Sequence, residues 1–188
     1  ELGVDLLSVA GHKLYGPKGV GALYVRSGTP IEPVLLGAGH ERGLRPGTEN
    51  VASIVGLGEA CEIAGRTLDE ESARVRRLRE RLWDVLRARI PGIALNGHPV
   101  ERLPNTLNVR FPGVRGSAML AAAPEIAAST GSACHEGDER PSGVLTAMGI
   151  PETDALASVR LSLGRSTCEA DVDAAVVSLV RAWKQLAR

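Results

Sequence analysis

Lys13 is the first residue of this sequence whose type and setting could carry out covalent chemistry. It lies in the segment HKLYGPKG between two apolar runs, and the only other lysines are Lys18 and Lys184. A lysine among glycines at the end of a strand can form a Schiff base with an aldehyde, provided that its amine loses its proton. An ordinary turn lysine is the alternative that local sequence alone leaves open.

Cys134 is the second such residue. Its segment, STGSACHEGDERPSG, is rich in serine and glycine, and a thiol on an exposed polar loop can act as a nucleophile or carry sulfur. Cys61 falls in the apolar helix segment EACEIA and is predicted to be a core residue. Cys168 precedes the last predicted helix, whose N-terminus could favour a thiolate, although a surface cysteine at a helix cap is the alternative.

Metal and disulfide chemistry are poorly supported. The three cysteines have no C-x-x-C spacing, and the four histidines, His12, His40, His98 and His135, have no metal-ligand spacing. We therefore expect no metal, and a reducing, cytoplasmic setting is the default for such a chain.

Arg160 could bind a carboxylate. It lies in an alternating segment whose apolar residues share one face, so its side chain points to the other face together with Ser158 and Ser162. A guanidinium on a rigid strand suits bidentate capture of an amino-acid carboxylate. A solvent-facing arginine on a half-exposed sheet is the alternative.

The segment GAGHERGLRPGTEN, residues 37–50, has parts that suit an anion such as phosphate. It offers the hydroxyl of Thr48, several backbone N–H groups and the charges of Arg42 and Arg45. A flexible surface loop without a ligand is the alternative.

The elements that must position these residues follow from hydrophobic periodicity and from turn residues. Residues 4–10 and 20–26 are predicted to be short buried strands, and Asn50 is predicted to cap a helix. Further strands are expected over 106–111, 126–129 and 158–163, and helices over 51–64, 69–89, 116–122 and 141–148. A last helix is expected after a capping box formed by Ser166 and Glu169.

Composition excludes some classes of function. The chain has 188 residues, 44% of them hydrophobic, and 22 basic side chains balance 22 acidic ones. This balance lacks the basic footprint of a nucleic-acid binder. No apolar run approaches the roughly 18 residues of a membrane span, so neither nucleic acid nor membrane is an expected partner.

Four segments, taken in order, closely resemble the cysteine desulfurases and the related selenocysteine lyases. They are GHKLYGPKGVGALYVR, GHERGLRPGTENV, STGSACHEG and VRLSLGRST. These are class-V aminotransferase-like enzymes that use pyridoxal 5'-phosphate. The resemblance implies an α/β fold of the aspartate-aminotransferase type (fold type I), of which this chain is the C-terminal half. Residues 1–65 would end the large cofactor-binding domain, and residues 66–188 would form a small α+β domain.

The resemblance also implies roles for matching positions. Lys13 would hold pyridoxal 5'-phosphate, with His12 beside the cofactor phosphate. Thr48 would contact the phosphate in a partner subunit, which implies a homodimer with shared sites. Cys134 would receive sulfur from L-cysteine as a persulfide and pass it to an acceptor protein, and Arg160 would bind the substrate carboxylate.

Some positions depart from the usual pattern of the family. Ala10 stands where many desulfurases have a phosphate-binding serine, and the segments HEGDERPSG and RPGTEN look more like those of the selenocysteine lyases. L-selenocysteine is therefore the alternative substrate. The upstream half of the family pattern supplies much of the cofactor pocket, so a non-catalytic fragment that cannot hold the cofactor alone is the alternative from another class. A generic transaminase, which would not need Cys134, is a third alternative.

Overall fold

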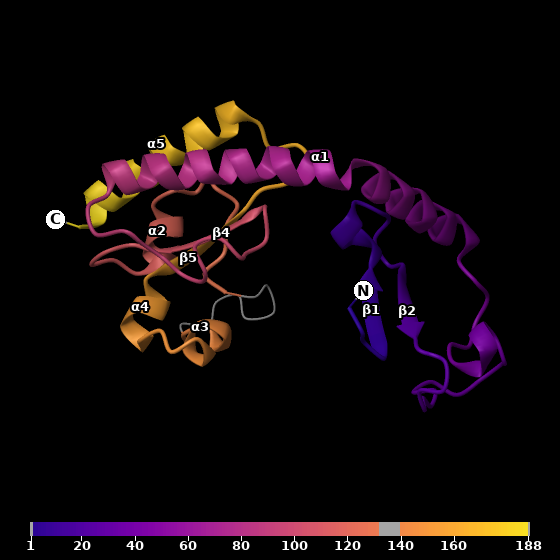
Figure 1. Cartoon of the computed structure of the whole chain (residues 1–188). Helices are drawn as coiled ribbons and strands as arrows, with labels where there is room; N and C mark the ends of the chain where they lie inside the picture. The colour runs from indigo at the N-terminus through magenta and orange to yellow at the C-terminus, as the bar shows by residue number, and fades with distance from the viewer. Residues whose placement is uncertain (1, 132–139, 188) are drawn as a thin grey trace. The chain divides into compact units, whose positions relative to one another are not determined.

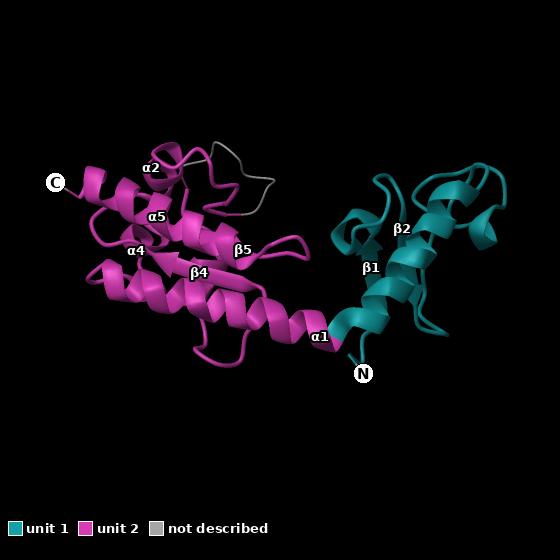
Figure 2. Ribbon diagram, turned by 90° about the horizontal axis from the view of Figure 1, so that it is seen from above, with its two compact units in different colours: residues 1–68 teal, residues 69–188 magenta. Residues whose placement is uncertain are grey.

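The computed structural model of the chain describes residues 2–131 and 140–187. These residues divide into two compact units, Glu1–Leu68 and Asp69–Arg188 (Figure 2). The long helix α1, Val51–Arg89, belongs to both units. The assignment of residues 1–65 to a large cofactor domain and of 66–188 to a small one stays a prediction.

Unit 1 begins with a hairpin of two antiparallel strands joined by a short 3-10 helix. The elements are β1, Leu6–Ala10, then η1, Gly11–Leu14, and β2, Gly21–Val25 (Figure 1). Both strands are mostly exposed, so the prediction that they are buried is wrong for this chain. The physical reason is that strand side chains point to the two faces of the sheet, and the described residues leave most of these side chains uncovered.

A second 3-10 helix, η2, Glu41–Gly43, precedes α1. The predicted cap is confirmed, because the backbone N–H of Ser53 donates to Oδ1 of Asn50 at 3.3 Å. The two helices expected over 51–64 and 69–89 are one continuous helix. No proline interrupts residues 65–68, and the hydroxyl of Thr67 donates to the carbonyl of Ile63 within the helix, so the backbone pattern carries on.

Unit 2 is built on a three-stranded antiparallel sheet of order β3–β4–β5. Its strands are β3, Ala94–Leu95, β4, Thr106–Arg110, and β5, Ser158–Ser162. The later part of α1 and α5, Glu169–Leu186, run along one side of this sheet (Figures 1 and 2). The core between them is apolar and includes Leu82, Leu86, Val109, Val159 and Leu179.

The described residues of unit 2 also form three short helices: α2, Gly116–Ala121, α3, Gly143–Ala147, and α4, Glu152–Leu156. The sequence did not predict α4 or β3. The strand expected over 126–129 is reduced to a single bridge between Ser129 and Arg160.

The start of the last helix also differs from the prediction. Cys168 is its N-cap and forms the capping box with Asp171. Ser166 and Glu169 do not form it, because Thr167 turns the chain first by accepting a hydrogen bond from the N–H of Gly164 at 2.9 Å. Over the part of the chain that the structure describes, none of these helices has the length and apolar character needed to cross a membrane.

Candidate active-site residues

Lys13 and His12 lie side by side in η1, and both side chains are exposed. The turn around them is closed by backbone bonds: the N–H of Gly11 donates to the carbonyl of Val20 at 2.8 Å, and that of Gly16 to the carbonyl of Gly11 at 3.0 Å. A Cβ atom at Gly11 would lie 2.9 Å from the oxygen of Val20, so only glycine allows this approach. The sequence segment thus forms a turn, closed by backbone hydrogen bonds, that presents the amine of Lys13.

Thr48 is exposed in a turn that Arg45 and His40 hold together. The guanidinium of Arg45 donates to the carbonyls of Gly47 at 2.8 Å and of Thr48 at 3.1 Å. Nδ1 of His40 accepts the N–H of Gly47 at 3.3 Å. The sequence suggests that the charge of Arg45 could attract an anion. In the structure its guanidinium also holds the turn that presents Thr48.

Arg160 lies on the polar face of β5, as the alternation predicted. Its neighbours Val159 and Leu161 are 0% and 5% exposed and point into the core. Asn108 of β4 lies directly opposite Arg160, so the two side chains share one face of the sheet. Ser129 pairs with Arg160 on the other edge of β5.

A hydrogen-bonded network covers part of this polar face. Nδ2 of Asn96 donates to Oδ1 of Asn108 and to Oγ of Ser158, both at 2.8 Å, and the Ser158 hydroxyl donates to the carbonyl of Asp154 at 2.7 Å. Arg110 donates to Oδ1 of Asn96 at 3.2 Å. Because buried polar groups need partners, this network fixes the strand pair that carries Arg160.

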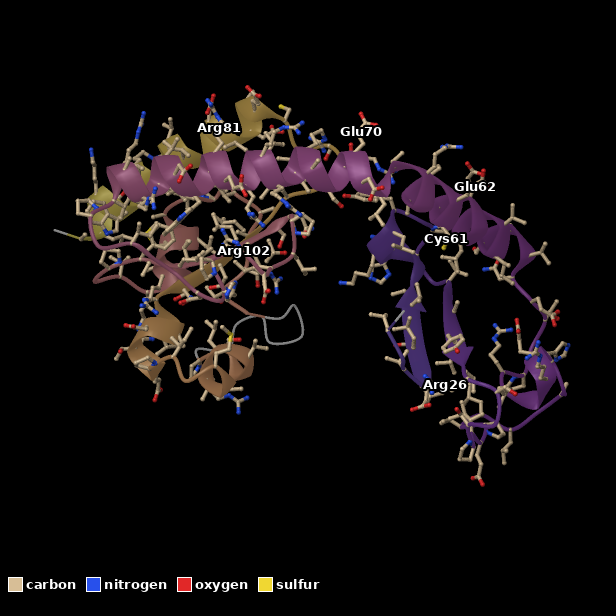
Figure 3. The ribbon with its side chains drawn as sticks, viewed as in Figure 1. Arg26, Cys61, Glu62, Glu70, Arg81 and Arg102 are labelled. Carbon is tan, nitrogen blue, oxygen red and sulfur yellow. The ribbon has the colours of Figure 1, made fainter. Side chains whose placement is uncertain are left out.

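The cysteines differ from the predictions in one respect. Cys61 is exposed on the first half of α1 (Figure 3), so its prediction as a core residue is wrong. The apolar positions near it, such as Ile54 and Val55, are also uncovered. Cys134 lies outside the described residues.

Cys168 is an exposed cap residue, which agrees with the surface interpretation. Its backbone N–H donates to Asp171 at 2.8 Å, and this bond, followed by one from its thiol, holds the pKa of Asp171 below the usual range. The thiol of Cys168 is therefore engaged with a carboxylate.

The site residues fall in both units: His12, Lys13 and Thr48 belong to unit 1, and Arg160 belongs to unit 2. No group of three or more metal-ligating side chains occurs among the residues that the structure describes.

Sequence reasoning missed Ser129 as a neighbour of Arg160. The predicted strand that ends at this serine was the available signal, but nothing local says which strand it pairs with.

Comparison with known proteins identifies the family to which the chain belongs. The sequence pattern of the family "Aminotransferase class-V" matches residues 1–175. A cysteine desulfurase of Gluconacetobacter diazotrophicus is 49% identical over 172 residues, which are 90% of this chain and 43% of that protein. The cysteine desulfurase IscS of Methanosarcina thermophila is 49% identical over 175 residues, which are 92% of this chain and 43% of that protein.

Solved structures agree with this result. A NifS-like protein from Rickettsia africae has a TM-score of 0.86 and 31% identity, and the match covers 97% of this chain and 48% of that one. The predicted fold, part of a fold type I α/β protein, is confirmed. The chain spans less than half the length of the curated relatives it matches. By its sequence pattern and its fold, the chain belongs to the aminotransferase class-V family.

Proposed function

We propose that the protein is a pyridoxal-phosphate-dependent cysteine desulfurase, which converts L-cysteine to L-alanine and leaves the sulfur on Cys134 as a persulfide. The observation that carries this proposal is the backbone pairing of Ser129 with Arg160. Only five positions separate Ser129 from Cys134. The pairing therefore places Ser129, which precedes Cys134 in the chain, beside the residue proposed to hold the substrate.

The described residues fit pyridoxal 5'-phosphate chemically. An aldehyde needs an accessible amine, which Lys13 offers on a hydrogen-bonded turn, and a phosphate needs donors, which exposed His12 and Thr48 can provide. When bound, this cofactor supplies an electron sink for the bonds at the substrate Cα. The named relatives, which are cysteine desulfurases, support the same assignment.

The residues of this chain then have separate roles. Nζ of Lys13 would hold the cofactor aldehyde, and the same amine would take the substrate Cα proton as a general base. The guanidinium of Arg160 binds the substrate carboxylate and sets the orientation of the Cα–H bond. The network around Asn108 keeps the strand that carries Arg160 in place.

Cys134 completes the reaction in this proposal. Its thiolate attacks the substrate sulfur, so an S–S bond forms as the substrate C–S bond breaks. The substrate Cβ keeps the electron pair of the broken C–S bond and takes a proton, Cα regains the proton taken by Lys13, and the product leaves as alanine. Cys134 keeps the sulfur as a persulfide. The persulfide then passes to an acceptor protein. A homodimer in which Thr48 reaches the partner's cofactor, and a cytoplasmic location, belong to the same proposal.

Release of alanine from L-cysteine by the full-length protein, loaded with pyridoxal phosphate, tests the function. We expect Cys134→Ser to abolish turnover, while Cys168→Ser, which changes the exposed cap cysteine, keeps it within about twofold. Unchanged alanine release in Cys134→Ser would contradict the role of Cys134. Transfer of the amino group to a keto acid, with the C–S bond of cysteine left intact, would instead indicate a transaminase. A parallel assay with L-selenocysteine decides the alternative substrate: turnover of selenocysteine alone would identify a selenocysteine lyase.

A further inference from the structure

We propose that Ser129 is a positioning residue that couples the substrate-binding arginine to the segment carrying the reactive thiol. This inference rests on the proposed function and adds a residue to it. Ser129 touches neither cofactor nor substrate in this proposal. It acts through two separate sets of hydrogen bonds, one from its backbone and one from its hydroxyl.

The backbone of Ser129 holds Arg160. The N–H of Arg160 donates to the carbonyl of Ser129 at 2.7 Å, and the N–H of Ser129 donates to the carbonyl of Arg160 at 3.2 Å. In antiparallel strands, a residue that exchanges both bonds with one neighbour exchanges none with the residue on its other side. Asn108 is therefore the non-bonded neighbour of Arg160, and both backbone polar groups of Arg160 depend on Ser129.

The hydroxyl of Ser129 holds Gly131. It donates to the carbonyl of Gly131 at 2.7 Å and accepts the N–H of Gly131 at 3.1 Å. Glycine has the greatest backbone freedom of any residue, so these two bonds restrict a position that would otherwise be loose. Gly131 precedes Cys134 by three positions. The hydroxyl thus restrains Gly131, the last described residue before Cys134.

The two sets of bonds can be separated by mutation. Ser129→Ala removes the hydroxyl and leaves the backbone bridge to Arg160, so substrate binding should be kept while presentation of the thiol is lost. We expect kcat for alanine release to fall roughly tenfold, with KM within about twofold of the original value. Ser129→Thr keeps an oxygen at the same position and should restore kcat to within about threefold.

Hydrogen exchange in the same full-length protein tests the geometry without using activity. In Ser129→Ala the amide of Gly131 should exchange roughly tenfold faster, while the amide of Arg160 keeps its protection. Thr146→Ala is the matched control, because it removes another hydroxyl that bonds to a backbone carbonyl, that of Ser142 at 3.2 Å. This variant should change neither kcat nor the exchange of Gly131.

The outcomes separate the inference from the function. If the original protein is active and Ser129→Ala keeps its kcat, or if Ser129→Thr fails to restore it, the inference is overturned and the function stands. An equal loss in Thr146→Ala would also overturn it, because the effect would be general. If the original protein releases no alanine from L-cysteine, the proposed function fails, and the role of Ser129 fails with it.

Discussion

Lys13 and Lys18 are two exposed lysines at either end of the same turn, and only the first is assigned to the cofactor. When the full-length protein is mixed with pyridoxal phosphate and reduced with borohydride, we expect a stable pyridoxyl adduct on Lys13. Peptide mass spectrometry should find the adduct lost in Lys13→Ala and kept in Lys18→Ala. An adduct that persists at the same level in Lys13→Ala would contradict the assignment of this lysine.

Arg102 matters for stability, because two nitrogen atoms of its guanidinium group lack hydrogen-bond partners among the described residues. It lies in the loop between β3 and β4 (Figure 3), and its Nε and Nη1 are buried without a hydrogen-bond partner among the described residues. Burial, and then the nearby charge of Arg79, lower the pKa of Arg102. Arg79 itself is better placed, since it donates to the carbonyl of Leu103 at 2.8 Å and to Glu80 at 3.0 Å.

A buried donor without a partner costs about 1–3 kcal/mol, so removal of the Arg102 guanidinium should not weaken the fold. We expect Arg102→Met to raise the free energy of unfolding by about 1 kcal/mol in urea titrations. Arg76→Met, at an exposed position of α1, should change it by less than about 0.5 kcal/mol. A clear loss of stability in Arg102→Met would mean that the guanidinium has a partner outside the described residues.

At the scale of elements, an ion pair on α1 holds the loop that follows β5. Arg74 donates to both carboxylate oxygens of Glu71 and also to the carbonyls of Gly164, Arg165 and Thr167. The hydrogen bond from Arg74 is the main reason why the pKa of Glu71 is lowered. The pair therefore orients Arg74 toward the end of the strand that carries Arg160.

This pair gives a pH dependence with a definite sign. Because the folded state lowers the pKa of Glu71, its contribution is fully present above the ordinary value of 4.5 and is lost as pH falls through the lowered value. Urea titrations between about pH 3 and pH 6 should show a smaller loss of stability on acidification in Glu71→Gln than in the original chain. Glu70→Gln, on the outer side of α1 (Figure 3), should keep the original pH dependence.

The contact of α2 with β5 depends on a glycine. A Cβ atom at Gly116 would lie 2.4 Å from the oxygen of Ser158, so α2 would have to move away from the strand that holds Arg160. We expect Gly116→Ala to destabilise the fold by about 1–3 kcal/mol in urea titrations. Gly143→Ala is the control, because nothing lies within 4 Å of a Cβ atom there. Equal losses of stability in the two variants would show that the close contact between Gly116 and Ser158 does not cause the destabilisation.

The sequence predicted those elements whose signal is local. The alternation around Arg160 gave the correct buried face of β5, and Asn50 gave the correct start of α1. Pairing between distant segments could not be predicted, because it depends on tertiary packing. Ser129 is the clearest example: its hydroxyl closes a local turn, but its partner Arg160 is 31 positions away.

For the candidate site, residue types and order were enough to select Lys13, Thr48 and Arg160, while their settings had to come from the structure. The side chain of Arg45 illustrates the limit. Its charge suggested an anion ligand, which stays a prediction, but the sequence did not show that its Nη1 donates to the carbonyls of Gly47 and Thr48. Cys61 was misplaced for the same kind of reason, because a helical apolar pattern does not say whether anything covers it.

At the scale of the whole molecule, the two units differ in how well they bury apolar side chains. The main core lies in unit 2, where Leu107, Val109 and Val159 are fully buried. In unit 1, by contrast, large apolar side chains of both strands are about half exposed, including Leu6, Leu23 and Tyr24. A sheet of two strands with no covered face is marginally stable in water. We therefore expect the apolar side chains of unit 1 to become protected only when contacts are added to those within this chain. The chain spans less than half the length of its curated relatives.

Hydrogen exchange can measure this dependence directly. In the 188-residue chain, we expect the amides of β1 and β2 to exchange at least about 100-fold faster than those of β4 and β5, because local opening is cheap where few apolar contacts are buried. In the full-length protein the exchange of β1 and β2 should slow by a similar factor, while β4 and β5 change little. Their strong protection already in the 188-residue chain would mean that the hairpin is stable by itself. The turn that presents Lys13 would then form without contacts from outside the 188-residue chain.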